Sequence, residues 1–202
     1  ITQRGALPSC ITDMRILIIG AGCVGSMISE LLVREGVQYI VIVDDDILEI
    51  GNLTRHTLSI DDVNQNKAKA LCRHLANINP NVKTKSIEKK IRDVNDIQGL
   101  KEYDLIIDCS ASSSVLKAFS RMEWDRDIFM ASVSLSIGAK YFFISLQKGK
   151  HFEFKDFIDT INSYTKEDEE FDSNLFPRDG IGCWHPAFPA RMDDVVSGAA
   201  LS

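Results

Sequence analysis

Four charged residues of this chain could bind a charged ligand together: Asp44, Arg55, Lys67 and Asp108. Asp44 and Asp108 each come after a short apolar run that is typical of a buried strand. Because ligands bind outside the carboxyl ends of the strands in open parallel sheets, we expect both acids at one ligand-binding edge. Arg55 and Lys67 bring positive charge to the same edge. A triphosphate needs such cations to neutralise its β- and γ-phosphates, whereas a dinucleotide needs few.

The acid at 108 is also suited to a metal. A carboxylate oxygen is a hard ligand, so Asp108 could hold Mg²⁺ against the phosphates. Each residue has an ordinary alternative: Arg55 and Lys67 are types that often form surface salt bridges, and Asp108 could cap the following helix. The presence of both acids and both cations around one sheet edge favours the triphosphate interpretation.

A glycine-rich turn precedes Asp44. Gly20, Gly22 and Gly25 have the spacing G-x-G-x-x-G and follow the apolar run Arg15–Ile19. Glycines let the backbone approach a phosphate, and the helix that follows supplies N–H donors and the positive end of its dipole. Asp44, at the end of the next run, is placed to accept from ribose hydroxyls. Alone, this motif is more typical of an NAD or FAD fold.

Apolar periodicity predicts the elements that position these residues. Strands are predicted over 15–19, 39–44, 82–87, 104–109 and 128–133, with 141–146 as a further strand or edge hairpin. Helices are predicted from residue 24 and over 66–78, 112–121 and 193–201, with a short helix or turn at 93–100. The alternation predicts an α/β fold, a doubly wound and mainly parallel sheet with a Rossmann-like nucleotide-binding turn.

Composition narrows the class of protein. The 202 residues are 45% hydrophobic and 26% charged, which suits one sizeable α/β domain. A net charge of −6 argues against nucleic-acid binding, and no apolar run approaches membrane-spanning length. Five scattered cysteines without a C-x-x-C pair indicate neither a zinc site nor a disulfide framework, so we expect a reducing, cytoplasmic setting. Because the chain begins without methionine, we expect a fragment of a longer protein.

The pattern weakens over 150–182. This segment is polar, and 166–170 is almost wholly charged, so a solvent-facing loop or mobile crossover segment is expected.

Four separated elements resemble a known family. G-A-G-C-V-G-S, V-D-D-D-I-L-E-I-G-N-L-T-R-H, N-K-A-K-A and D-L-I-I-D-C-S have the order and spacing of the ThiF/MoeB/ubiquitin-activating-enzyme adenylation domain, over roughly 12–135. The flanking R-G-A-L-P, R-H-T-L and G-C-W-H-P-A-F-P-A-R are similar to the bacterial anti-phage branch, in which a ubiquitin-conjugating-like domain precedes the ThiF-like one. The resemblance implies a single adenylation domain over 1–202.

The resemblance also implies roles for individual residues. Asp46 and Asn52 would form an acid–asparagine arm beside the phosphates. Arg55 and Lys67 would neutralise ATP, and Asp108 would bind Mg²⁺. The implied reaction is attack of a protein C-terminal carboxylate on the α-phosphate, which gives an acyl-adenylate and pyrophosphate. The protein substrate would be a ubiquitin-like or sulfur-carrier protein, and such domains usually form homodimers.

Two features depart from the family. Many relatives carry a second acid in D-x-T-D-N, where this chain reads D-C-S-A-S from Asp108, so a further metal contact is in doubt. The C-x-x-C pairs of many relatives are missing, so no structural zinc is expected.

A cysteine near the end of the chain is a candidate for thioester transfer. Cys183 follows the polar segment, and His185 beside it could lower the pKa of the thiol. The alternative is a loop cysteine packed under Trp184 and Phe188. His56 we expect to be structural or on the surface.

Other functions remain to be weighed against adenylation of a carrier protein. An NAD(P)-dependent Rossmann oxidoreductase would bind nicotinamide and would not need Arg55 or Lys67. Within the adenylating family, the acceptor could instead be a small peptide or a tRNA base. The sequence does not decide the acceptor.

Overall fold

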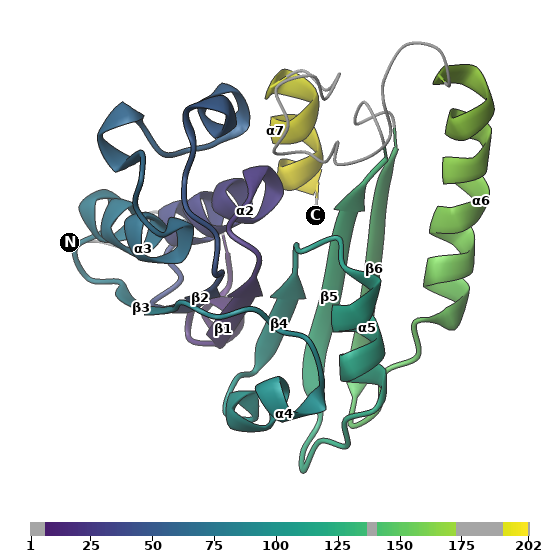
Figure 1. Cartoon of the computed structure of the whole chain (residues 1–202). Helices are drawn as coiled ribbons and strands as arrows, with labels where there is room; N and C mark the ends of the chain where they lie inside the picture. The colour runs from purple at the N-terminus through teal and green to yellow at the C-terminus, as the bar shows by residue number, and fades with distance from the viewer. Residues whose placement is uncertain (1–6, 137–140, 173–191, 202) are drawn as a thin grey trace.

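A single mixed sheet organises the chain (Figure 1). The computed structural model describes residues 7–136, 141–172 and 192–201. Within these ranges the strand order is β3-β2-β1-β4-β5-β6, with β1 to β5 parallel and β6 antiparallel to β5. The strands are β1 (Arg15–Ile19), β2 (Tyr39–Val43), β3 (Lys83–Ile87), β4 (Leu105–Asp108), β5 (Ile128–Leu135) and β6 (Phe142–Gly149).

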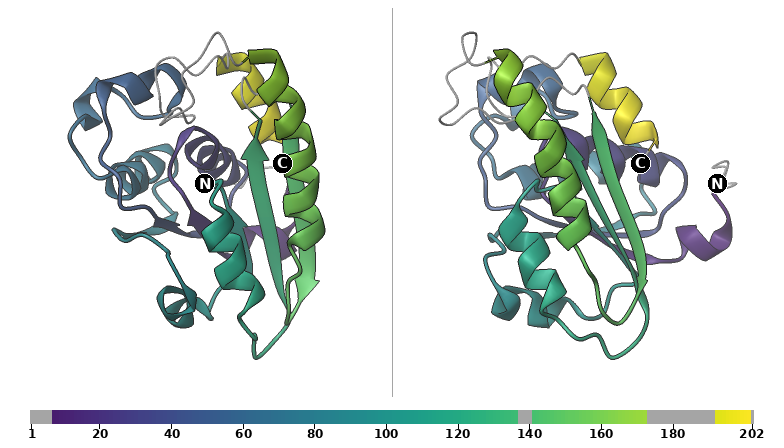
Figure 2. Two further views of the ribbon diagram at one scale, coloured as in Figure 1. Left: turned by 45° about the vertical axis from the view of Figure 1, so that its right-hand side comes forward. Right: turned by 90° about the vertical axis from the view of Figure 1, so that its right-hand side faces the viewer.

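Helices cover both faces of the sheet, as Figures 1 and 2 show. One face is packed against α2 (Cys23–Arg34), α3 (Lys67–Ile78) and α7 (Met192–Leu201). The other is packed against α4 (Val94–Ile97), α5 (Ser113–Ser120) and α6 (Lys155–Asp172). Short elements complete the chain: α1 (Ser9–Thr12), η1 (Ile50–Arg55), η2 (Ile60–Asp62) and η3 (Gln98–Leu100). The doubly wound fold predicted from the sequence is confirmed.

Strand β1 lies at the centre of two hydrophobic clusters. Ile16 and Ile18 point toward α2 and α3, whereas Leu17 and Ile19 point toward α4 and α5. Successive side chains of a strand alternate between the two faces of the sheet. A parallel strand that is covered by helices on both faces therefore has a continuous run of apolar residues. This is why the runs that precede Asp44 and Asp108 predicted the sheet correctly.

The predicted limits of α2 and α3 have clear physical causes. Gly36, predicted to end α2, has φ +103°, and the N–H of Val37 donates to Leu32 O, which satisfies a carbonyl of the last turn. The side chain of Asn66 caps α3 by accepting from the N–H of Lys69 at 3.0 Å. The cap fixes the first residue of α3, Lys67, at the sheet edge.

One expectation is wrong. The charged run 166–170 was expected to be loop, but it belongs to α6, which runs along the β5–β6 side of the sheet (Figure 2). Phe157 and Ile158, early in this helix, pack against the cluster on the α5 face. Lysine and glutamate are good helix formers, so a charged run does not by itself exclude a helix. Residues 173–182 of the expected crossover segment lie outside the described residues.

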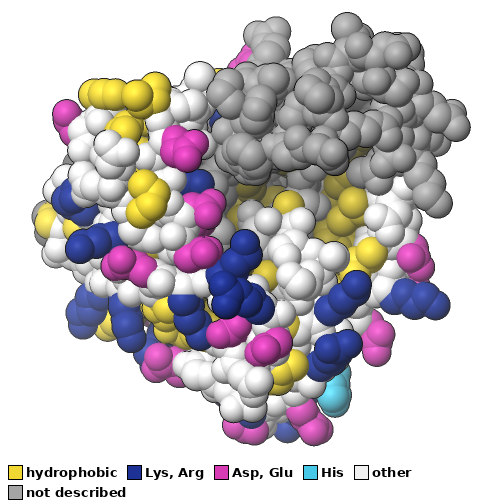
Figure 3. Space-filling model, viewed as in Figure 1, with side chains coloured by type: hydrophobic (Ala, Val, Ile, Leu, Met, Phe, Trp, Pro, Cys, Tyr) yellow, Lys and Arg dark blue, Asp and Glu magenta, His cyan; other side chains and the backbone are white. Residues whose placement is uncertain are grey.

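The described surface is mixed in charge. Figure 3 shows acidic and basic side chains interspersed over the face seen in Figure 1, without a stripe of one sign. Within the described ranges, no helix combines the length and the apolar character needed to cross a membrane.

Candidate functional site

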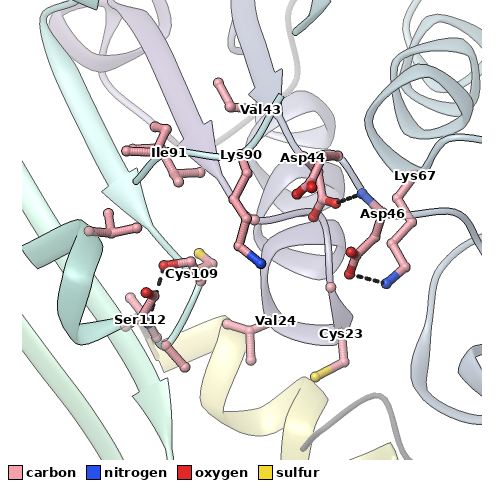
Figure 4. Close-up of a pocket in the computed structure, with 18 of the residues that line it drawn as sticks. Cys23, Val24, Val43, Asp44, Asp46, Lys67, Lys90, Ile91, Cys109 and Ser112 are labelled. Carbon is pink, nitrogen blue, oxygen red and sulfur yellow. Dashed lines mark hydrogen bonds and ion pairs between the residues drawn. The ribbon is translucent and has the colours of Figure 1, made fainter. Parts of the chain in front are cut away.

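A cavity of about 510 Å³ opens at the carboxyl edge of the sheet (Figure 4). Its volume is within the range of small-molecule sites, roughly 300–1,000 Å³. Its walls come from the glycine turn after β1, the acids after β2, the start of α3, the β3–α4 connection and the turn after β4. Because β1 and β4 are neighbours whose connections leave in opposite directions, this is the topological switch point of the sheet.

The three glycines of the motif differ in what they make possible. Gly20 has φ +92°, and a Cβ there would lie 3.0 Å from the backbone of Cys109. A Cβ on Gly25 would lie 1.9 Å from Gly20 O, so Gly25 permits close packing of α2 against the turn. At Gly22 no atom lies within 4 Å of an added Cβ. Gly20 and Gly22 therefore line the cavity, and Gly25 supports them from behind.

Asp44 connects the end of β2 to the glycine turn. Its Oδ2 accepts from the N–H of Ala21 at 2.6 Å, and its Oδ1 accepts from the N–H of Asp46 at 2.8 Å. Burial raises the pKa of Asp44 above its ordinary value, and these two N–H donors oppose the rise. The carboxylate thus fixes the turn and also lines the cavity, where it can accept from a ribose hydroxyl.

Lys67 and Asp46 form an ion pair on the cavity wall. Lys67 Nζ lies 3.0 Å from Asp46 Oδ2, as Figure 4 shows. The Lys67 side chain is 7% exposed, whereas that of Asp46 is 61% exposed. Asn66 donates from Nδ2 to the carbonyl oxygens of Asp44 and Asp46, so the helix cap also ties α3 to the acids after β2. A buried cation is therefore held beside the glycine turn.

The residues of η1 divide between the cavity and the interior. Asn52 lines the cavity, and its Oδ1 accepts from the N–H of Glu49 at 2.9 Å in a capping box. Arg55 is buried at 6% exposure and has interaction partners, but it is not among the described residues that line the cavity. The structure thus brings Lys67, Asp46 and Asn52 together at the cavity and buries Arg55 outside its described lining.

Asp108 is more deeply buried than its predicted role requires. It is 1% exposed and is not among the described residues that line the cavity, whereas the next two residues, Cys109 and Ser110, do line it. Its Oδ1 accepts from the N–H and the hydroxyl of Ser110, at 3.0 and 2.6 Å, and its Oδ2 accepts from Ser132 Oγ at 3.3 Å. Burial raises the pKa of Asp108 to about 6, although these hydrogen bonds oppose the rise.

The chemistry of this carboxylate fits a magnesium ligand. Mg²⁺ commonly takes one or two carboxylates and keeps several waters. Asp108 Oδ2 accepts one long hydrogen bond and so retains a lone pair for an ion. Asp108 is buried and is not among the described residues that line the cavity, so an ion reaches this oxygen only if the residues around it move.

Sequence reasoning underestimated His56. The ring is buried and lines the cavity, and burial lowers its pKa to about 4, so it is neutral near pH 7. Its Nδ1 accepts from the N–H of Leu58 at 3.2 Å, which leaves the hydrogen on Nε2 to donate to Ala21 O at 2.7 Å. His56 therefore holds the same turn as Asp44 does. Its place directly after Arg55 was the available signal.

Lys90 was not predicted at all. It lies in the β3–α4 connection between Ile91, which is buried, and Lys89, which pairs with Asp96. Figure 4 shows the Lys90 side chain extending into the cavity. Among the described residues it has no ion-pair or hydrogen-bond partner. No sequence motif distinguishes it from its neighbour, because only the fold decides which lysine of the pair faces the cavity.

The cysteines differ in where they lie and in how suited their thiols are to be nucleophiles. Cys183 lies outside the described residues. Cys23 and Cys109 line the cavity, and burial raises the pKa of Cys109 well above its ordinary value. Burial likewise raises the pKa of Cys72 to about 11. These last two thiols are thus poorly suited to be nucleophiles.

Comparisons with known proteins identify relatives of this chain. Two curated relatives are "ATP-dependent ubiquitin transferase-like protein Cap2" of Enterobacter hormaechei subsp. hoffmannii, 36% identical over 98% of this chain, and "Molybdopterin-synthase adenylyltransferase" of Escherichia coli (strain K12), 31% identical over 63%. The chain spans 33% of the first relative's length and 49% of the second's.

The fold has solved counterparts as well. A crystal structure of E. coli MccB with AMPCPP and MccA superposes with a TM-score of 0.66 at 20% identity, over 95% of this chain and 54% of that one. At this identity the likeness concerns the fold. A model of the ThiF family matches residues 8–136, which is more than half of the sequence. The chain therefore belongs to the ThiF family.

Proposed function

We propose that the chain catalyses ATP- and Mg²⁺-dependent adenylation of the C-terminal carboxylate of a ubiquitin-like or sulfur-carrier protein. The observation that carries the proposal is the pairing of buried Lys67 with Asp46 beside Gly20 and Gly22, in one cavity. An NAD(P)-dependent oxidoreductase would have little use for a buried cation at this place, whereas a triphosphate needs one.

The cavity offers a place for each part of ATP. Asp44 would hold the ribose, and the open space at Gly22 would let the phosphates approach the start of α2. Lys67 and Asn52 would contact the β- and γ-phosphates, with Arg55 adding positive charge from outside the described lining. When ATP binds, Lys67 would exchange exposed Asp46 for phosphate, which costs little because Asp46 is solvated.

Catalysis would rest on positioning and on charge. An acceptor carboxylate is already ionised near pH 7, so its attack on the α-phosphorus needs no general base from the protein. Lys67 and Arg55 would stabilise the negative charge that gathers on the leaving pyrophosphate. Magnesium, when bound through Asp108, would add further charge neutralisation. His56 and Asp44 keep the glycine turn in one conformation through their bonds to Ala21.

The descriptions of two relatives support the proposed class of acceptor. One is described as ubiquitin transferase-like and ATP-dependent, and another as a molybdopterin-synthase adenylyltransferase. We propose in addition that the active form is a homodimer within a longer protein that includes a conjugating-enzyme-like domain. Thioester transfer to Cys183 is part of the same proposal.

Mass spectrometry tests the proposed reaction directly. The chain is incubated with ATP, magnesium and a panel of ubiquitin-like and sulfur-carrier proteins, and each acceptor is examined for an added AMP at its carboxyl terminus. We expect the adduct on at least one acceptor, and a reducible acceptor–chain conjugate that is lost in Cys183→Ala. A chain that binds a nicotinamide cofactor and never transfers AMP would contradict the proposal.

A further inference from the structure

Strand β5 contributes a hydroxyl to the cavity wall that has no partner among the described residues. Ser134 lines the cavity, and its Oγ is buried without a hydrogen-bond partner in the described part of the chain. Buried hydroxyls are almost always hydrogen-bonded, because a lost hydrogen bond to water must be replaced. The Oγ is closed to solvent as it stands, but a serine hydroxyl changes position by rotation about χ1, and such a rotation would let a ligand in the cavity supply the missing partner.

The neighbours of Ser134 on the same strand are both satisfied. Ile128 and Met130 of β5 belong to the hydrophobic cluster on the α5 face, and alternation places Ser132, Ser134 and Ser136 on that face too. Ser132 Oγ donates to Asp108, and Ser136 Oγ accepts from the N–H of Tyr141 at 2.9 Å. Within the ranges that the structure describes, the middle serine of the three is the one without a partner, and it is also the one that lines the cavity.

Ser134 and Lys67 approach the cavity from opposite faces of the sheet. Lys67 begins α3, which packs on the face that includes α2. Ser134 points to the α5 face, two residues beyond the point where β5 pairs with Asp108. A ligand group that Ser134 contacts is therefore separate from the groups that Lys67 contacts.

The geometry of phosphorus chemistry then identifies that group. In a displacement at phosphorus, the attacking and leaving oxygens lie roughly in line on opposite sides of the phosphorus atom. If Lys67 holds the leaving pyrophosphate, as the proposed function requires, the incoming oxygen arrives from the side of Ser134. We propose that Ser134 is the hydrogen-bond donor that binds the acceptor carboxylate before attack and its carbonyl oxygen in the acyl-adenylate.

The bond changes are balanced in this arrangement. One carboxylate oxygen forms a bond to the α-phosphorus, the bond from that phosphorus to the α–β bridging oxygen breaks, and pyrophosphate leaves with the electron pair. Ser134 donates to the other carboxylate oxygen and transfers no proton. A neutral hydroxyl suits this place, because it orients the carboxylate without neutralising the charge that makes it a nucleophile.

Two non-reactive ligands distinguish the contact between Ser134 and the acyl group from binding of the nucleotide itself. Sulfamoyl-adenosine and glycyl-sulfamoyl-adenosine differ only in the acyl group, and glycyl is the smallest aminoacyl group. Calorimetry gives the affinity of the whole chain for each compound and for ATP. We expect Ser134→Ala to weaken binding of the glycyl compound roughly five- to tenfold and to leave the other two affinities within about twofold.

Thermal unfolding distinguishes a ligand contact of Ser134 from a purely structural role. If Ser134 only stabilised the fold, its replacement would lower the melting temperature. Because alanine removes an unpaired buried polar atom, the melting temperature of Ser134→Ala should equal or exceed that of the parent. Thr57→Val is the matched control, since Thr57 Oγ1 is also buried without a partner but Thr57 does not line the cavity. This variant should keep all three affinities.

Two results would overturn the assignment of Ser134: an unchanged affinity for the glycyl compound, or an equal loss for both sulfamoyl compounds. The inference rests on the proposed function, and failure of that function looks different. A parent chain that binds neither ATP nor either sulfamoyl compound contradicts adenylation itself, before any variant is compared.

Discussion

Two walls of the cavity differ in whether their buried charge is paired with an opposite charge. The arm wall, made of Asp46, Asn52 and Lys67, pairs its buried cation with an exposed acid. The strand wall, where Ser134 lines the cavity and the nearby Asp108 and Ser132 do not, buries an acid among serine donors. A buried charge without an opposite charge is costly, and this cost appears as the raised pKa of Asp108. The arm wall is therefore stable before a ligand arrives, whereas the strand wall is completed by one.

Replacing the buried acid gives the largest expected effect. Asp108→Asn should lower ATP–pyrophosphate exchange roughly 100- to 1,000-fold, because the site loses an electrostatic group near the reacting phosphate. The same change should raise the unfolding free energy at pH 7 by up to about 3 kcal/mol, since the amide need not be buried as a charge. Isotope exchange and denaturant unfolding measure the two effects.

Asp104→Asn is the control, because Asp104 lies before the other end of β4 and pairs with Arg126 at 2.8 Å. It should leave exchange unchanged. Undiminished exchange in Asp108→Asn would remove Asp108 from the mechanism.

Substitution of the cation in the arm wall should affect ATP binding more than it affects stability. Lys67→Ala should weaken ATP binding roughly 10- to 100-fold through loss of a charge-assisted contact. The unfolding free energy should change by no more than about 1 kcal/mol, because the acid left behind is solvated. Calorimetry with ATP measures the affinity, and Lys69→Ala, an exposed lysine on the same helix, should match the parent. Equal affinity in the two variants would contradict the role of Lys67.

Two buried titratable residues of the site, His56 and Asp108, should make opposite contributions to the dependence of stability on pH. The pKa of His56 falls from 6.5 to about 4 on folding, so between these values only the unfolded chain binds the proton, and this group makes stability rise with pH. The pKa of Asp108 rises from 3.8 to about 6, so only the folded chain binds that proton, and stability falls with pH over that range. The two contributions, each about 3 kcal/mol at most, largely cancel.

Single substitutions should reveal the separate contribution of each residue to the change of stability with pH. Asp108→Asn should leave a stability that rises from pH 4 to pH 6.5, and His56→Gln one that falls from pH 4 to pH 6. Glutamine keeps an N–H donor for Ala21 but cannot take up the charge. Denaturant unfolding across this range measures both. Parallel slopes in the two variants would contradict the burial that the structure gives these groups.

We expect the smallest effect on ATP binding from replacement of Lys90, the exposed lysine that extends into the cavity (Figure 4). Lys90→Ala should weaken ATP binding roughly two- to threefold at low salt and not at all at high salt, because the charge of an exposed lysine is screened. Lys117→Ala, an exposed lysine on α5, is the charge-matched control. A loss that persists at high salt would place Lys90 in direct, dehydrated contact with the nucleotide.

The parts of the molecule predictable from sequence are those with a periodic or local cause. Apolar runs identified the strands, and Gly36 and Asn66 marked the ends of helices because each has a backbone role. The arm wall was also visible, since its residues follow one another along the chain. Helix α6 was missed because its charged residues resemble a loop when no packing face is assumed.

The strand wall depends on pairing between strands distant in sequence. Ser132 reaches Asp108 only because β5 and β4 pair in that register, and Ser134 owes its place to the same register. His56 and Lys90 similarly reach the cavity from connections whose paths follow from tertiary packing. Their burial and partners become apparent only in the folded chain.

A crystal structure of the chain with magnesium and a non-hydrolysable ATP analogue tests the central claim most directly. The account predicts the ribose at Asp44, the triphosphate between Gly22 and Lys67, and the space at Ser134 open to an acceptor. A nucleotide bound with its phosphates away from Lys67, or bound outside this cavity, would contradict it.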